Sequence, residues 1–175
     1  MNRSARIAGA ATVFALCTTA AIGQMMGPTG MLTRQDAGSA ADMGLVHDLV
    51  MNNGRITRTV TNLPNGIKTV TESDDPRVAQ ALKAHVGSMS RRLEEGRDFN
   101  LFSDTLPVIF DHAKSISSKV ETTPNGIVVT RTSDDPAVVA ALQGHAAEVT
   151  ELVRDGMAAM HRGMMRRMAA GPPRR

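Results

Sequence analysis

The amino-acid sequence predicts an α+β domain that is a tandem duplication of an α-β-β-α unit, with a four-stranded antiparallel sheet packed against helices. Two observations carry this prediction: the chain matches itself when shifted by 60 residues, and each copy holds a hairpin signal followed by a helix signal. Without a gap, 15 of the 41 residues from 56 to 96 are identical to their counterparts at 116 to 156. Self-similarity at a fixed period is typical of a repeated structural unit.

The blocks that the two copies share each predict one structural element. Pro64-Asn65-Gly66 recurs at 124–126 between β-prone runs, which predicts a hairpin turn because Pro presets φ and Asn and Gly tolerate left-handed backbone. Ser-Asp-Asp-Pro at 73–76 and 133–136 predicts the start of a helix, since an oxygen side chain caps free amides and Pro is tolerated in the first turn. Each of these helices is predicted to end at a glycine, Gly96 and Gly156.

Composition divides the chain into four segments. Residues 1–23 predict a secretory signal peptide, because a basic start precedes an apolar run too short to span a bilayer. Residues 24–41 are interpreted as a flexible leader rich in Met and Gly, and residues 161–175 as a basic, Met-rich tail that ends in disorder. The single duplicated domain is expected at 42–160, with copies at about 42–98 and 102–158 and a further short helix before each hairpin. We therefore expect a periplasmic or secreted protein.

Several functional classes are disfavoured by the residues present. Cys17 is the only cysteine and lies in the predicted signal, so the remaining chain offers no disulfide, thiolate nucleophile or thiolate metal ligand. Nucleic-acid binding is not expected of an exported chain without Trp or Tyr to stack on bases. Helix capping accounts for the paired aspartates, and no serine lies in a nucleophile motif, so we expect no enzymatic activity.

His85 and His145 occupy the same place in the two copies, at the edge of the apolar face of each predicted long helix. Imidazole is the commonest side-chain ligand for transition metals, and Met89, one turn after His85, would add a soft thioether. The same histidine pair could instead hold a non-covalent haem iron from both sides. Burial with ordinary hydrogen bonds is the competing structural interpretation, because duplication copies structural residues as well.

The tail carries a second group of candidate ligands at helical spacing: Met157, Met160, His161, Met164 and Met168. Thioethers are neutral and prefer soft Cu(I), and the segment resembles in composition the Met-rich stretches of periplasmic copper-handling proteins. Alternatively, the methionines pack on the body as the end of the last helix while the arginines stay solvated. A basic amphipathic helix could also contact anionic lipid or a partner protein.

Together these features favour a periplasmic metal-binding protein that serves as a copper chaperone or buffer. One alternative is a haem protein that uses His85 and His145 as axial ligands. The other is a non-catalytic interaction module, whose C-terminal helix docks on a periplasmic or membrane protein. Association of the chain into a homodimer is compatible with each of the three.

Overall fold

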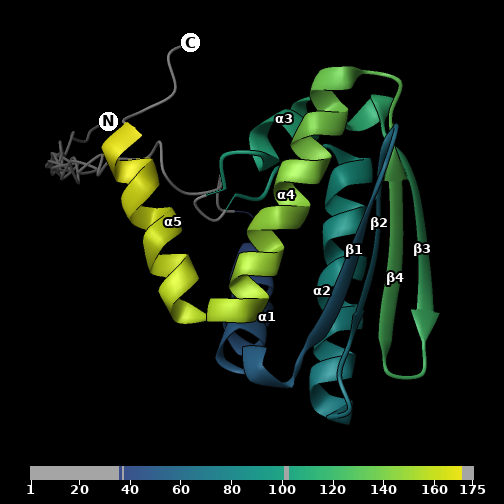
Figure 1. Ribbon diagram of the computed structural model, residues 1–175. Helices are drawn as coiled ribbons and strands as arrows, with labels where there is room; N and C mark the ends of the chain where they lie inside the picture. Colours follow the sequence, from purple (N-terminus) through teal and green to yellow (C-terminus); the bar gives the residue numbers. More distant parts are fainter. Residues whose placement is uncertain (1–35, 37, 101–102, 171–175) are drawn as a thin grey trace, which may run out of the picture.

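A computed structural model describes residues 36, 38–100 and 103–170 (Figure 1). The predicted signal peptide, residues 24–35 and 37 of the predicted leader and the last residues of the tail lie outside the described part of the chain, whereas the end of the leader, residues 39–41, belongs to the first helix. The helices are α1 (Ser39–Met51), η1 (Asn53–Arg55), α2 (Pro76–Glu95), α3 (Leu106–Asp111), η2 (Ala113–Ser115), α4 (Pro136–Asp155) and α5 (Met157–Ala170). The strands are β1 (Thr57–Leu63), β2 (Gly66–Glu72), β3 (Ser117–Thr123) and β4 (Gly126–Thr132).

The predicted α+β class is confirmed. Four antiparallel strands form one sheet in the order β1-β2-β4-β3, so each hairpin contributes one central and one edge strand. In the described part of the chain the helices cover a single face of this sheet (Figure 1). Residues that alternate along the central strands are therefore buried on the helix side, as the period of two predicts for a half-covered sheet.

Elements of the second half follow those of the first at an offset of 60 residues. The two hairpins have equivalent registers, and β2 pairs with β4 so that Thr69 lies opposite Val129, its own counterpart in the second copy. This arrangement is the pseudo-twofold pairing expected for two units that cannot bury a core alone. The origin of the chain by duplication stays a prediction from the sequence.

The two long helices begin as predicted, but they end differently. Asp75 and Asp135 accept hydrogen bonds from the amides two residues ahead at 2.9 and 2.8 Å, each directly before the proline of the first turn. Gly96 has the expected left-handed conformation, with φ of 65°. Gly156 has φ of 55° but ψ of −130°, so it bends the chain directly into α5 and is not a left-handed cap. The prediction that both long helices end at a glycine with positive φ is confirmed, and only the second copy continues from this glycine into another helix.

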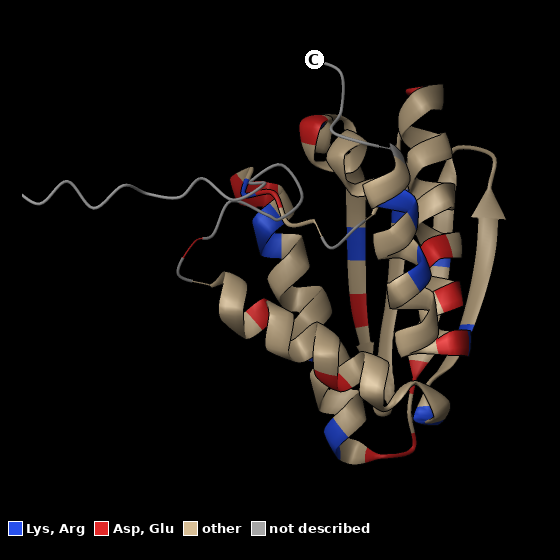
Figure 2. Cartoon of the chain, turned by 90° about the vertical axis from the view of Figure 1, so that its left-hand side faces the viewer, with Lys and Arg blue, Asp and Glu red and all other residues tan. Residues whose placement is uncertain are grey.

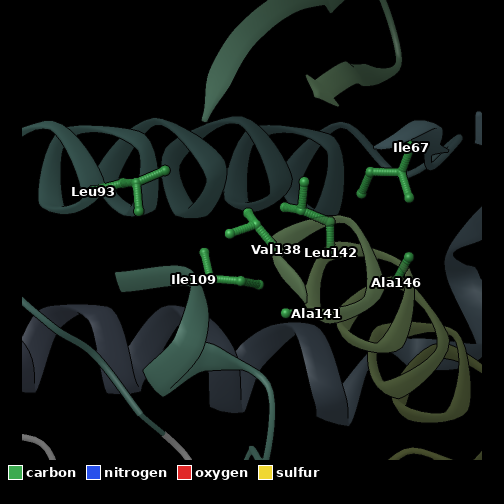
Figure 3. Packing of buried hydrophobic residues seen from close by; sticks show 7 residues of the cluster. All are labelled: Ile67, Leu93, Ile109, Val138, Ala141, Leu142 and Ala146. Atoms are coloured by element: carbon green, nitrogen blue, oxygen red, sulfur yellow. The ribbon is translucent and has the colours of Figure 1, made fainter. Parts of the chain in front are cut away.

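The core lies between the sheet and the long helices (Figure 3). Val138 and Leu142 of α4 are 0% and 1% exposed, and they cluster with Ile67 of β2 and Ile109 of α3. Each long helix also packs on the central strand of the opposite half, α4 on β2 and α2 on β4. The two halves therefore share one interlocked core.

Helix α5 packs against α4 and carries basic residues that are partly neutralised within the molecule. Arg162 pairs with Asp155, and Arg167 contacts Asp104 at 3.3 Å. On the side of the molecule that carries α5, basic and acidic residues both occur (Figure 2). Among the described residues, no helix is both long and apolar enough to cross a membrane.

Candidate functional site

Four of the predicted ligands line one cavity of about 250 Å³ between the helices and the sheet. His85 and Met89 come from α2, His145 from α4 and Met160 from α5. Each of these side chains is partly buried, and most of the remaining wall is apolar. The fold thus brings together the histidines of the two copies with one methionine from the body and one from the tail.

The imidazole of His145 lies beside a carboxylate. Its Nδ1 lies 3.5 Å from Oε2 of Glu148, one helical turn later on α4. Glu148 also accepts hydrogen bonds from the hydroxyls of Ser103 and Thr105 at 2.6 and 2.9 Å. Burial alone would raise the pKa of Glu148, but the nearby imidazole of His145 and the hydrogen bonds from Ser103 and Thr105 lower it to about 2. The contact between His145 and Glu148 is no hydrogen bond, because Nδ1 of His145 is buried without a hydrogen-bond partner among the described residues.

His85 lacks such a partner. Its Nδ1 is buried and has no hydrogen bond among the described residues. Burial lowers the pKa of His85 to about 4; the carboxylate of Asp42 opposes this shift, while the positive charges of His145 and Arg131 add to it. At neutral pH the imidazole is therefore uncharged and keeps a lone pair available for a ligand.

The remaining predicted ligands are exposed on the surface of α5. Met157, Met164 and Met168 are 47%, 38% and 53% exposed, and His161 is exposed as well. The body-facing side of α5 consists of smaller residues, with Ala159 only 5% exposed and Gly163 on the cavity wall. The alternative in which a methionine face packs on the body is therefore wrong for three of the four tail positions, because close packing on α4 favours the small residues.

Two arginines of the sheet also line the cavity, and the sequence analysis did not single them out. Arg58 lies on β1 and Arg131 on β4, both on the helix-covered face. Neither forms an ion pair within the described part of the chain. The available signal was a basic residue at an inward position of a strand, where an alternating pattern would place an apolar one.

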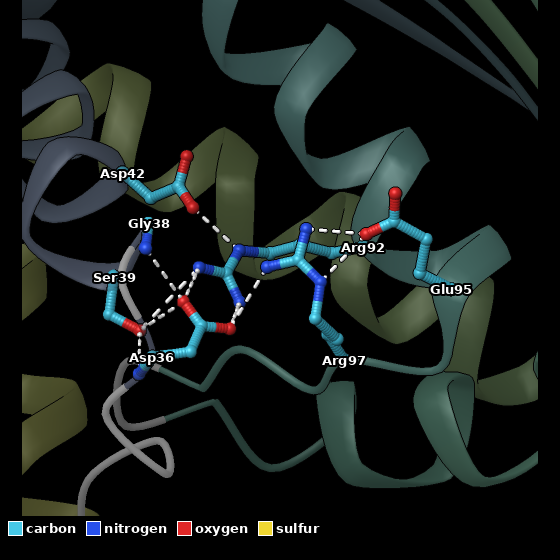
Figure 4. Close-up of polar contacts among 7 residues, drawn as sticks. All are labelled: Asp36, Gly38, Ser39, Asp42, Arg92, Glu95 and Arg97. Carbon is cyan, nitrogen blue, oxygen red and sulfur yellow. Dashed lines mark hydrogen bonds and ion pairs between the residues drawn. The ribbon is translucent and has the colours of Figure 1, made fainter.

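A third arginine, Arg92, is fully buried and fastens the segment before α1 to the end of α2 (Figure 4). Its Nε donates to Asp42 at 2.5 Å, and its two terminal nitrogens donate to Asp36 at 2.7 Å. Its guanidinium also lies 5.3 Å from the ring centroid of Phe99. This cluster fixes the point at which the predicted leader reaches the body, and its completed ion pairs mark it as structural.

Comparison with known proteins assigns no function. No family model matches the chain, and neither a curated protein nor a solved structure is significantly similar to it. Within the described ranges, no three His, Cys, Asp or Glu side chains are grouped so that they could hold a metal ion. A metal in the cavity would therefore need the methionine thioethers as ligands.

Proposed function

We propose that this protein binds Cu(I) in the cavity between its helices and its sheet, as a periplasmic copper chaperone or buffer without catalytic activity. The supporting observation is that His85, Met89, His145 and Met160 come from three helices to one cavity. Two imidazoles and two thioethers would make a soft ligand set, which suits Cu(I).

The protonation state of His85 supports this choice. A metal ligand must offer a lone pair, and His85 is held neutral by its burial. Glu148 places a carboxylate oxygen 3.5 Å from Nδ1 of His145, and a carboxylate next to the imidazole is common at metal-binding histidines. A monovalent ion also suffers less repulsion than a divalent one from Arg58 and Arg131 in the same cavity.

The exposed face of α5 has a separate part in this proposal. Met157, His161, Met164 and Met168 are accessible from solvent, so they would collect Cu(I) weakly before it enters the cavity. Capture at an exposed thioether surface followed by tighter interior binding is the behaviour expected of a buffer.

The first test is a Cu(I) titration against a competing chelator under reducing conditions. The His85→Ala/His145→Ala variant should lose most of the high-affinity binding. The matched control, His47→Ala/His112→Ala, removes two exposed histidines and should bind as the wild type does. Equal affinities for wild type and the His85/His145 variant would contradict an interior site.

The role of Glu148 can be measured separately. Glu148→Gln keeps the size of the side chain but removes the negative charge next to Nδ1 of His145, so it should weaken Cu(I) binding by about 10–100-fold. An absorption spectrum after haem addition tests the alternative cofactor. A Soret band that the His85→Ala/His145→Ala variant lacks would replace the copper proposal with the haem one.

A further inference from the structure

Arg58 has a buried nitrogen without a hydrogen-bond partner. Its Nη1 donates to Oγ1 of Thr71, its neighbour on β2, at 2.6 Å. Its Nε is buried and finds no acceptor among the described residues, and Nη2 makes no hydrogen bond there either. The two free nitrogens form one edge of the guanidinium, and this edge belongs to a side chain on the cavity wall.

This unsatisfied nitrogen lowers the stability of the folded protein. Burial lowers the pKa of Arg58 to about 10, so the group is still charged at neutral pH. No carboxylate of the described chain forms an ion pair with it. Glu148, which also lines the cavity, is occupied by Ser103, Thr105 and His145. A charged side chain with one buried, unused donor is stabilised by an anion placed against that donor.

The rest of the cavity is suited to an apolar group. Its walls are formed largely by aliphatic and aromatic side chains of α1, α2, α3 and α4: Leu49, Leu82, Val86, Phe110, Val149 and Leu152. An inorganic anion would satisfy Arg58 but leave these surfaces unfilled. An uncharged apolar molecule would fill them but leave the guanidinium without a partner.

We propose that the cavity binds a small amphipathic carboxylate, such as a medium-chain fatty acid, with its head group on Arg58 and its tail between the helices and the sheet. Nε and Nη2 of Arg58 would donate in parallel to the two carboxylate oxygens, the bidentate geometry for which the guanidinium fork is suited. Arg131 is the second cation of the cavity, but its Nε already donates to Ser118 at 3.4 Å. The proposal does not depend on metal binding.

The test uses the purified metal-free protein and octanoate as the probe, followed by calorimetry and by thermal unfolding. Octanoate should bind the wild type and raise its Tm, because a ligand that binds only the native state stabilises it. 1-Octanol lacks the charge and should bind at least tenfold more weakly. Inorganic phosphate, which lacks the tail, should bind more weakly as well. Equal binding of 1-octanol, or binding of phosphate but not octanoate, would overturn the proposal.

Variants then locate the head group. Arg58→Met removes the uncompensated charge, so this variant should be at least as stable as the wild type without ligand and should lose octanoate affinity at least tenfold. Arg58→Lys keeps the charge without the fork and should bind at an intermediate level. The matched control, Arg131→Met, should bind octanoate within a few-fold of the wild type. Unchanged affinity in both Arg58 variants would refute the assignment, and so would a loss confined to Arg131→Met.

Discussion

Gly66 and Gly126, the first residues of the two central strands, lie directly against the backbone of the neighbouring strand. A Cβ at Gly66 would be 2.0 Å from the carbonyl oxygen of Arg131, and one at Gly126 would be 2.1 Å from that of Thr71. The Pro-Asn-Gly hairpin was predicted correctly, but for Gly126 the reason differs, because close approach and not a left-handed backbone requires the glycine. Nothing within one hairpin reveals this, since the backbone in contact belongs to the other copy.

Gly126→Ala should therefore destabilise the protein, although alanine is a small residue. The added methyl group forces the two central strands apart, at a cost of roughly 1–3 kcal/mol or more. Gly87→Ala in α2 is the matched control, because its Cβ would meet nothing within 4 Å and alanine favours a helix by about 1 kcal/mol. Urea unfolding compares the two variants. A Gly126→Ala protein as stable as the wild type would contradict the close approach.

At the scale of elements, the Arg92 cluster attaches α1 to α2 and should be a major determinant of stability. Arg92→Met leaves the carboxylate of Asp42, 4% exposed, buried without its cation, which typically costs about 3–5 kcal/mol. Arg91→Met, at the exposed neighbouring position, should change the free energy of unfolding by less than about 0.5 kcal/mol. The additional change Asp42→Leu should restore part of the loss in Arg92→Met. No recovery in the double variant would indicate that lost packing, and not an unpaired charge, causes the effect.

At the scale of the whole molecule, the two halves share one core. The titration of a single buried histidine therefore changes the stability of the whole fold. His85 has its pKa lowered to about 4 by burial, against about 6.5 in an unfolded chain. Between these values the unfolded chain binds a proton that the native protein does not, so stability falls as the pH decreases. The stability that comes from keeping His85 neutral is fully present above about pH 6.5. Up to about 3 kcal/mol of the free energy of unfolding is lost as the pH falls to 4.

His85→Gln removes this titration and should flatten the stability profile between pH 6.5 and 4. The measurement is the free energy of unfolding in urea at several pH values in this range, for the wild type and the variant. Parallel profiles would contradict the burial of a neutral imidazole at position 85. Glu148, whose pKa is lowered from 4.5 to about 2, begins to lose its own stabilising contribution below about pH 4.5, and this loss is common to both proteins and cancels in the comparison.

The sequence by itself determined the elements of the fold, because turns, caps and apolar periodicity are local properties that recur at positions 60 residues apart. It also singled out His85 and His145, since a repeated imidazole on a helix edge is visible without coordinates. Tertiary structure alone decided which candidates share a cavity: Met160 faces it, whereas Met157, Met164 and Met168 face solvent. The difference depends on which face of α5 packs on the body, where Ala159 is only 5% exposed. Arg58 became a candidate only from the structure, in which helices cover its face of the sheet. The burial of its Nε and the absence of a hydrogen-bond acceptor result from packing and cannot be read from the spacing of residues.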